Sequence, residues 1–226
     1  MLKRLIVVSA VLIAISPCAF ASDHEDDVAR TEKAARVFKE IMDIPDKGIP
    51  SGLLKSAKCI AIIPGDVKFA FIFGANYGRG VAACRTPTGW SAPMFVAIEG
   101  GSFGFQAGGS STDLVLLFMN QHALDSLLGD KFKLGADASI AAGPVGRTAS
   151  AATDVRLDAE ILSYSRAKGL FAGVSLAGAG FMADKSGDRS MYGHDVDRHE
   201  IVNGTIHAPA SARRFEHELD MYAGAV

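Results

Sequence analysis

The residues most suggestive of chemistry are a serine set among glycines and two closely spaced glycine pairs. Residues 100–104 read Gly-Gly-Ser-Phe-Gly and match the G-x-S-x-G pattern of serine hydrolases, with Ser102 in the nucleophile position. That nucleophile needs a strand before it and a helix after it, but residues 105–109 contain two further glycines and begin no helix. Gly78-Arg79-Gly80 and Gly178-Ala179-Gly180 imitate dinucleotide-binding turns, yet neither opens a helix. We interpret all three as glycine-rich strand or turn segments.

Histidine and carboxylate side chains gather once, at residues 194–199. His194, Asp197 and His199 would be the ligands if this segment held a metal ion, but a five-residue histidine spacing does not match a helical i, i+4 metal pair, and no cysteine lies nearby. A hydrated surface loop is the favoured interpretation. The sequence therefore predicts no catalytic residue, no cofactor and no metal site, and it gives no strong indication of an enzyme.

Near the N-terminus a basic residue recurs at every third position: Arg30, Lys33, Arg36 and Lys39. At 100° per residue, residues 28–42 are predicted to form an amphipathic helix. Its apolar half comprises Val28, Ala34, Ala35, Val37, Phe38, Ile41 and Met42. Two interpretations stay open: a helix that lies in a membrane interface and attracts anionic headgroups, or a surface helix that packs on its own domain. Glu32 and Glu40 dilute the positive charge and favour packing.

The first 21 residues have the pattern of a secretory signal peptide. Lys3 and Arg4 supply a positive start, residues 5–15 are apolar apart from one serine, and Ala19-Phe20-Ala21 supplies a small-x-small cleavage pattern. The apolar run is too short to span a bilayer. We therefore expect cleavage after Ala21 and export, most simply to a bacterial periplasm. Loss of the two basic residues takes the formal net charge from −2 to −4.

Cys59 and Cys84 remain in the expected mature chain. An oxidising compartment permits a disulfide between them, and such a bridge would stabilise the fold by ~3 kcal/mol. The alternative is that both are small buried hydrophobic residues in strands. The sequence leaves both alternatives open.

Composition narrows the fold class. With 49% hydrophobic residues the chain is too apolar for a disordered protein, and its net charge of −2 provides no positive field for nonspecific nucleic-acid binding.

Helices are expected at 28–42, 51–58, 120–128 and 209–222. Strands are expected at 59–63, 68–73, 80–85, 93–99, 114–119, 136–142, 155–163 and 170–183, and residues 186–203 look irregular. The 24 glycines suit bends and close approaches in a sheet. We predict a single α+β domain: a curved antiparallel sheet or small barrel flanked by N-terminal, central and C-terminal helices.

From about Lys33 to the C-terminus, the chain resembles the SYLF domain family in many ordered segments. The matching segments are 49–50, 53–54, 57–58, 61–64, 78–81, 90–93, 100–108, 112–115, 134–137, 143–147 and 163–176. The most distinctive is the last, which reads Ser-Tyr-Ser-Arg-Ala-Lys-Gly-Leu-Phe-Ala-Gly-Val-Ser-Leu. A single glycine run would be weak evidence, but these segments follow in order and are distributed over most of the chain.

The resemblance implies that residues 22–226 form a non-enzymatic lipid-binding domain. Eukaryotic members are similar to proteins that bind phosphoinositides and, in yeast-like relatives, actin filaments. Their lipid contact is attributed partly to a basic N-terminal amphipathic helix, which here corresponds to Arg30, Lys33, Arg36 and Lys39. Further headgroup contacts are expected from Lys55, Lys58, Arg147, Arg166 and Lys168.

The expected export changes the partners that the resemblance implies. Neither actin nor phosphoinositides are expected in a periplasm, so actin binding is not carried over. Anionic phospholipid at the bacterial membrane surface is the expected ligand. The alternative is a structural or protein-interaction module of the cell envelope, whose glycine-rich sheet docks a partner strand or peptide.

Overall fold

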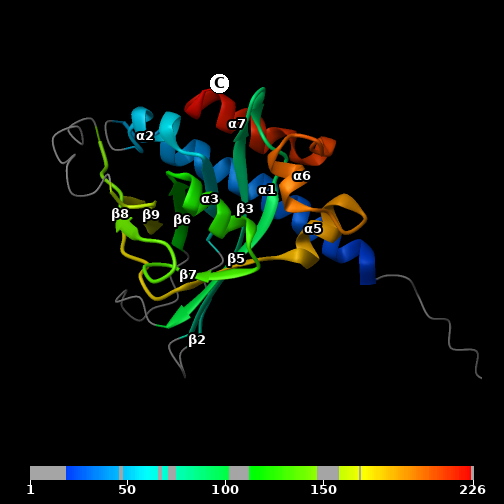
Figure 1. The fold of residues 1–226 in the computed structure, drawn as a ribbon, viewed down its shortest axis with the longest axis horizontal. Helices are drawn as coiled ribbons and strands as arrows, with labels where there is room; N and C mark the ends of the chain where they lie inside the picture. Colours follow the sequence, from blue (N-terminus) through cyan, green and yellow to red (C-terminus); the bar gives the residue numbers. More distant parts are fainter. Residues whose placement is uncertain are drawn as a thin grey trace, which may run out of the picture.

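A curled sheet of eleven described strands forms a half-barrel, and helices flank it (Figure 1). The computed structural model describes residues 19–45, 48–65, 68–70, 75–101, 112–146, 158–167 and 169–224. The strand order along the main path is β10-β9-β6-β1-β3-β5-β11-β7, while β2 and β4 pair with β3 and β8 pairs with β9. Every pairing is antiparallel except that of β8 with β9. The predicted α+β class with a curved, mainly antiparallel sheet is confirmed.

The strands are β1 (Cys59–Ile63), β2 (Lys68–Ala70), β3 (Ala75–Thr86), β4 (Gly89–Trp90), β5 (Met94–Gly101), β6 (Thr112–Phe118), β7 (Lys131–Lys133), β8 (Ile140–Ala142), β9 (Ile161–Ala167), β10 (Leu170–Gly173) and β11 (Gly180–Ala183). The helices are α1 (Ala19–Met42), α2 (Ser51–Ser56), α3 (Gln121–Leu128), α5 (Lys185–Tyr192), α6 (Arg198–Val202), the 3₁₀ turn η2 (Ala210–Ala212) and α7 (Arg213–Ala223).

The central strand β1 explains why its sequence is an unbroken apolar run. All five of its residues are buried, and alternate side chains enter two different cores. Cys59, Ala61 and Ile63 join a core that α3, α6 and β7 help to cover. Ile60 and Ile62 join a second core, built with α1, α2 and α7 on the opposite face of the sheet (Figure 1). A strand covered on both faces loses the polar alternation of a half-exposed strand.

The two cysteines lie directly opposite each other on β1 and β3. The register pairs Cys59 with Cys84, and their sulfur atoms are bonded, with the Cα atoms 3.9 Å apart. Both side chains are also buried in the core. Of the two alternatives that the sequence left open, the structure has the disulfide.

Some predicted elements are confirmed, and their end signals explain why. The helix at 120–128 is α3, and the Asn120 side chain caps it by accepting a hydrogen bond from the Ala123 backbone N–H at 2.8 Å. The closing helix expected at 209–222 is η2 followed by α7.

Other predictions were wrong in the second half of the chain. The single strand expected at 170–183 is two strands, β10 and β11, separated by a turn in which Gly178 has φ +90°. Residues 186–203 are not irregular, because α5 and α6 occupy most of them. Asp184 and Asp197 cap these helices, and Gly193 ends α5 at φ +77°. The strand expected at 136–142 is confined to β8, and β7 before it was missed.

Arg85 fixes the ends of two helices to β3. Its guanidinium donates to four backbone carbonyl oxygens, those of Leu54, Ala57, Ala223 and Gly224, at 2.8–3.1 Å. These carbonyls lie at the C-terminal ends of α2 and α7, where helices lack internal donors. The guanidinium also lies 4.5 Å from the centre of the Trp90 ring. One side chain therefore holds α2, α7 and β4 together.

Gly80 lies where β1 and β3 approach each other closely, so a substitution there tests the packing of these two strands. A Cβ atom at Gly80 would lie 2.2 Å from the Ile62 carbonyl oxygen and 2.8 Å from the Ile63 Cα. Because both contacts are backbone, Gly80→Ala should lower the free energy of unfolding by ~2 kcal/mol or more. Urea unfolding followed by circular dichroism measures this loss.

Gly52 in α2 is the matched control, since a Cβ there meets nothing within 4 Å. Gly52→Ala should stabilise the protein by ~0.5–1 kcal/mol, as alanine does in exposed helices. Equal unfolding midpoints for the two variants would contradict the packing at Gly80.

Candidate functional site

The apolar face of α1 is buried against its own domain. Phe38 and Ile41 are both 0% exposed and belong to the core on that side of the sheet. In the described part of the chain, no helix is both long and apolar enough to cross a membrane. Of the two interpretations of this helix, the structure has the packed one. The apolar face can enter a bilayer only if α1 first leaves the domain.

The outward face of α1 runs beside α7, and the two helices are parallel. Arg214 at the start of α7 pairs with Glu32 at 3.1 Å. Two to three turns further along, the Tyr222 hydroxyl donates to Asp43 at 2.5 Å and lies 3.5 Å from the Lys39 ammonium. The residue numbers of the paired positions therefore increase in the same direction along the two helices.

These contacts define one solvent-exposed surface, which we call the α1–α7 face. It comprises Arg36 and Lys39 from α1 and Arg214, His217 and Met221 from α7. Of these, Met221 is one of the few large apolar side chains of the described chain that is exposed, at 58%. Arg36 forms no ion pair with any described residue. The face therefore combines basic groups with an apolar side chain, which suits contact with a charged, amphipathic surface.

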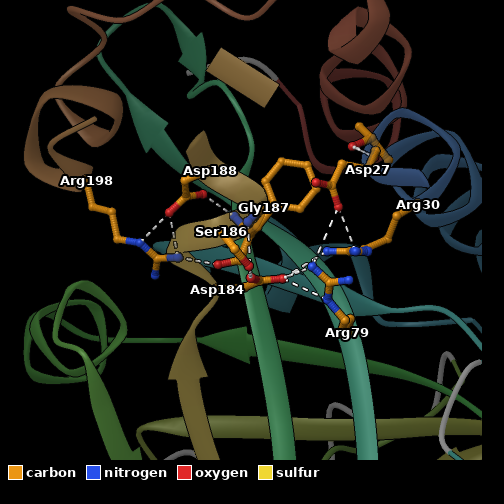
Figure 2. A network of polar contacts seen from close by, with 10 residues as sticks. Asp27, Arg30, Arg79, Asp184, Ser186, Gly187, Asp188 and Arg198 are labelled. Atoms are coloured by element: carbon orange, nitrogen blue, oxygen red, sulfur yellow. Dashed lines mark hydrogen bonds and ion pairs between the residues drawn. The ribbon is translucent and has the colours of Figure 1, made fainter. Parts of the chain in front are cut away.

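Arg30 does not share this exposed face, contrary to the expectation from its spacing. It is 8% exposed and pairs with Asp27 at 2.6 Å and with Asp184 at 3.1 Å (Figure 2). Its guanidinium lies 5.3 Å from the centre of the Phe95 ring. Since every charged group of a buried pair needs its partner, Arg30 is a structural residue here and is not accessible to a headgroup.

Asp184 is the centre of the buried polar cluster that holds α1 (Figure 2). One carboxylate oxygen accepts from Arg30 of α1 and twice from Arg79 of β3, at 2.7–3.1 Å. The other accepts from the Ser186 hydroxyl at 2.6 Å and from the Gly187 N–H at 3.1 Å, which caps α5. Burial alone would raise the pKa of Asp184, but these donors and the Arg79 charge outweigh it and lower the pKa.

A second buried pair continues the cluster toward α6. Asp188 accepts from the Phe95 N–H at 2.6 Å and from Arg198 at 2.9 Å, and Arg198 also donates to the Phe95 carbonyl (Figure 2). Burial nevertheless raises the pKa of Asp188, and it likewise raises the pKa of Asp27. The cluster ties α1, β3, β5, α5 and α6 together, and its role is positional.

The other predicted lipid contacts lie in several places. Lys33 is partly buried at the edge of α1. Lys55 and Lys58 are exposed, at the end of α2 and just beyond it. Arg166 on β9 is largely buried and pairs with Asp113 and with Glu40 of α1, both at 2.7 Å. Arg147 and Lys168 lie outside the described residues.

Sequence reasoning missed the contribution of α7 to this surface. Arg214, His217 and Met221 recur at helical spacing, which is the signal that could have identified an outward face. Nothing in the sequence shows that α7 lies beside α1, because the two helices are about 180 residues apart.

The motifs considered first do not form a reaction centre among the described residues. Ser102 lies outside them. Asp197 caps α6 through the His199 N–H at 2.9 Å, and His194 contacts a neighbouring backbone carbonyl. No group of three or more histidine, cysteine or acidic side chains in the described ranges is arranged to hold a metal ion.

Comparison with known proteins identifies the family of this chain. The family described as "Ysc84: Las17-binding protein actin regulator" matches residues 99–222. SH3 domain-containing YSC84-like protein 1 of Xenopus laevis is 33% identical over 86% of this chain and 60% of its own length. The human protein of that name is 33% identical over 86% of this chain and 58% of its own. Protein YSC84 of Saccharomyces cerevisiae is 34% identical over 81% of this chain and 41% of its own.

The chain therefore belongs to the Ysc84, or SYLF, family. It spans about three fifths of the length of the vertebrate relatives and two fifths of the yeast one. The description of the family is that of a binding protein and actin regulator, and none of the names of these relatives describes an enzyme.

The anchoring of α1 by Asp184 can be tested with Asp184→Asn. The change removes the charge that both arginines face, and it should lower the free energy of unfolding by ~3 kcal/mol near neutral pH. Because the folded pKa of Asp184 is lowered, its contribution is present above its ordinary pKa of 3.8 and is lost as pH falls below that value. Hydrogen exchange of α1 amides should accelerate in the variant.

Asp195→Asn is the matched control, because Asp195 pairs with Arg189 on the surface, where the side chains are 76% and 63% exposed. Its effect should stay below ~0.5 kcal/mol. Equal losses in the two variants would contradict an anchoring role for Asp184.

Proposed function

We propose that this chain is an exported, non-enzymatic domain that binds anionic phospholipid at a membrane surface through the α1–α7 face. The observation that carries the proposal is that two adjacent parallel helices present Arg36 and Lys39 from α1, and Arg214 and the exposed Met221 from α7, on their outward sides. Family membership supports a binding role. The signal-peptide pattern of residues 1–21 supports export to the periplasm.

The charges on this face suit anionic headgroups despite the acidic net charge of the chain. Arg36 is exposed and has no partner among the described residues. Lys39 and Arg214 have carboxylate partners, but these ion pairs are exposed and contribute little. A lipid phosphate can replace such carboxylates at small cost, and arginine binds phosphate in two-pronged geometry. Binding should therefore be local, electrostatic and weakened by salt.

Binding on this face leaves the domain folded. The apolar side of α1 stays in the core and Arg30 stays in the buried cluster, so only outward side chains meet the lipid. Met221 then provides a shallow apolar contact with the lipid. This geometry favours peripheral attachment over insertion of a helix.

A protein-interaction module is the second candidate, and one observation favours it. β10 lies at the edge of the sheet, and its first residue, Leu170, is 78% exposed. Edge strands can pair with a strand from another chain. A partner docked there would leave the α1–α7 face unused, so the two candidates differ in which variants impair them.

Liposome flotation tests lipid binding. The triple variant Arg36→Glu, Lys39→Glu and Arg214→Glu should bind vesicles of phosphatidylglycerol and phosphatidylcholine at least ~tenfold more weakly, since each basic residue near an anionic surface contributes ~1 kcal/mol. Raising the salt from low to physiological concentration should weaken wild-type binding in the same direction.

Lys133→Glu, Lys185→Glu and Arg189→Glu make the same change in net charge at exposed positions on β7 and α5. This control variant should bind like the wild type apart from a small general loss. If the wild type does not float with anionic vesicles at low salt, or if the two triple variants lose binding equally, the proposed face is wrong.

A further inference from the structure

A small cavity lies beside the start of α7, and none of the residues of the α1–α7 face lines it. It has a volume of about 280 Å³ and lies between the β3–β4 turn, the segment after α6 and the first turn of α7. Its lining residues include Thr88, Trp90, His207, Arg213 and Glu216. Sites for drug-sized ligands are usually somewhat larger. A molecule of a few heavy atoms, or one lipid headgroup, would fill it.

The charges of its wall are incompletely paired. Glu216 is half-buried and forms no ion pair with any described residue. One turn along α7, an Asp220 carboxylate oxygen is buried without a hydrogen-bond partner in the described chain. Arg85 is near enough to interact with Asp220 electrostatically, but its guanidinium is occupied by four carbonyls. Two carboxylates on one helix face therefore form no ion pair with any described residue.

The titration of Glu216 reflects this environment. Burial, and then the neighbouring Asp220 charge, raise the pKa of Glu216 to about 7, although Arg213 acts in the opposite direction. A bound cation would compensate for both effects. The raised pKa thus agrees with the geometry, in which a carboxylate faces a cavity without a partner.

The remaining wall contains groups for a polar ligand with an opposite charge at its other end. The Thr88 hydroxyl makes only a long contact of 3.4 Å with Thr86, so it has capacity to accept from an ammonium group. Arg213 is exposed and forms no ion pair with any described residue. An anionic group at the cavity mouth would neutralise it. The pattern is a carboxylate inside and a guanidinium at the mouth.

We propose that this cavity binds a zwitterion of the phosphoethanolamine type, with its primary ammonium group at Glu216 and its phosphate at Arg213. The ammonium donates to the Glu216 carboxylate and the Thr88 hydroxyl, and the phosphate accepts from the Arg213 guanidinium. Such a group occurs both as a free metabolite and as the headgroup of a phospholipid. The assignment does not rest on the proposed binding to anionic lipid.

Trp90 provides a direct readout, because it is the chain's only tryptophan and part of the cavity wall. Titration with O-phosphoethanolamine should give a saturable change in tryptophan fluorescence. Glycerol 3-phosphate, which has the phosphate but no amine, should bind at least ~tenfold more weakly, as expected for loss of a charged hydrogen bond. A magnesium salt titrated alone should give no saturable change.

Two substitutions test the ammonium end and the phosphate end of the ligand separately. Glu216→Gln should weaken O-phosphoethanolamine binding at least ~tenfold, and Arg213→Gln should weaken both phosphate compounds. Glu25→Gln, at an exposed carboxylate outside the cavity, should bind like the wild type. Circular dichroism establishes that each variant is folded, and Arg213 is exposed, so its replacement tests the site even if Glu216→Gln is unstable.

Vesicles distinguish the two sources of the ligand. Flotation with phosphatidylcholine vesicles that contain phosphatidylethanolamine, lost in Glu216→Gln, assigns the site to a lipid headgroup. Binding seen by fluorescence without such flotation assigns the site to the free compound.

Four outcomes would each overturn the proposal. They are equal binding of glycerol 3-phosphate, unchanged binding in Glu216→Gln, a magnesium response in place of the amine response, and no response at all. Since these vesicles carry no net charge, the outcome is independent of binding to anionic vesicles.

Discussion

The pairing of buried charges around Asp184 is the constraint on which the helical layer depends. A carboxylate at this depth is tolerated only with several donors around it, and those donors come from α1, β3 and α5. Shifting any one of these elements would break at least one of the hydrogen bonds that the Asp184 carboxylate accepts. The apolar core tolerates small displacements better, because hydrophobic contact has little directional preference. The polar cluster therefore sets where α1 lies, while the core makes that position stable.

This constraint changes how an amphipathic helix in such a domain can act. A free helix with basic and apolar sides would use both at a membrane, but α1 has already used its apolar side in folding. The basic side chains that α1 leaves accessible are Arg36 and Lys39, and α7 adds Arg214, His217 and Met221 beside them. The proposed membrane-facing surface would therefore belong to the folded domain as a whole and would exist only when both helices are in place.

The sequence was sufficient where a local signal and the global fold agree. The apolar run at 59–63 and the Asn120 cap each correspond to one physical cause, so β1 and α3 were predictable. It was insufficient where long-range contacts decide. Asp184 and Asp197 look like polar loop residues in the sequence, yet they cap helices, and Asp184 also pairs with Arg30 across 154 residues. The regular spacing of Arg30 with Lys33 and Arg36 predicted exposure, because periodicity identifies a face without showing what covers it. The same limit hid the part that α7 plays in the site.

The bond between Cys59 and Cys84 has a consequence for how the sheet is assembled. The two residues lie opposite each other in one register of β1 and β3, and a slip of a single residue would turn one sulfur atom to the other face of the sheet. Oxidation can therefore join only chains in which these two strands have already found their correct alignment. In an oxidising compartment, the covalent bond would act as a check on strand alignment and would retain that alignment through later partial unfolding.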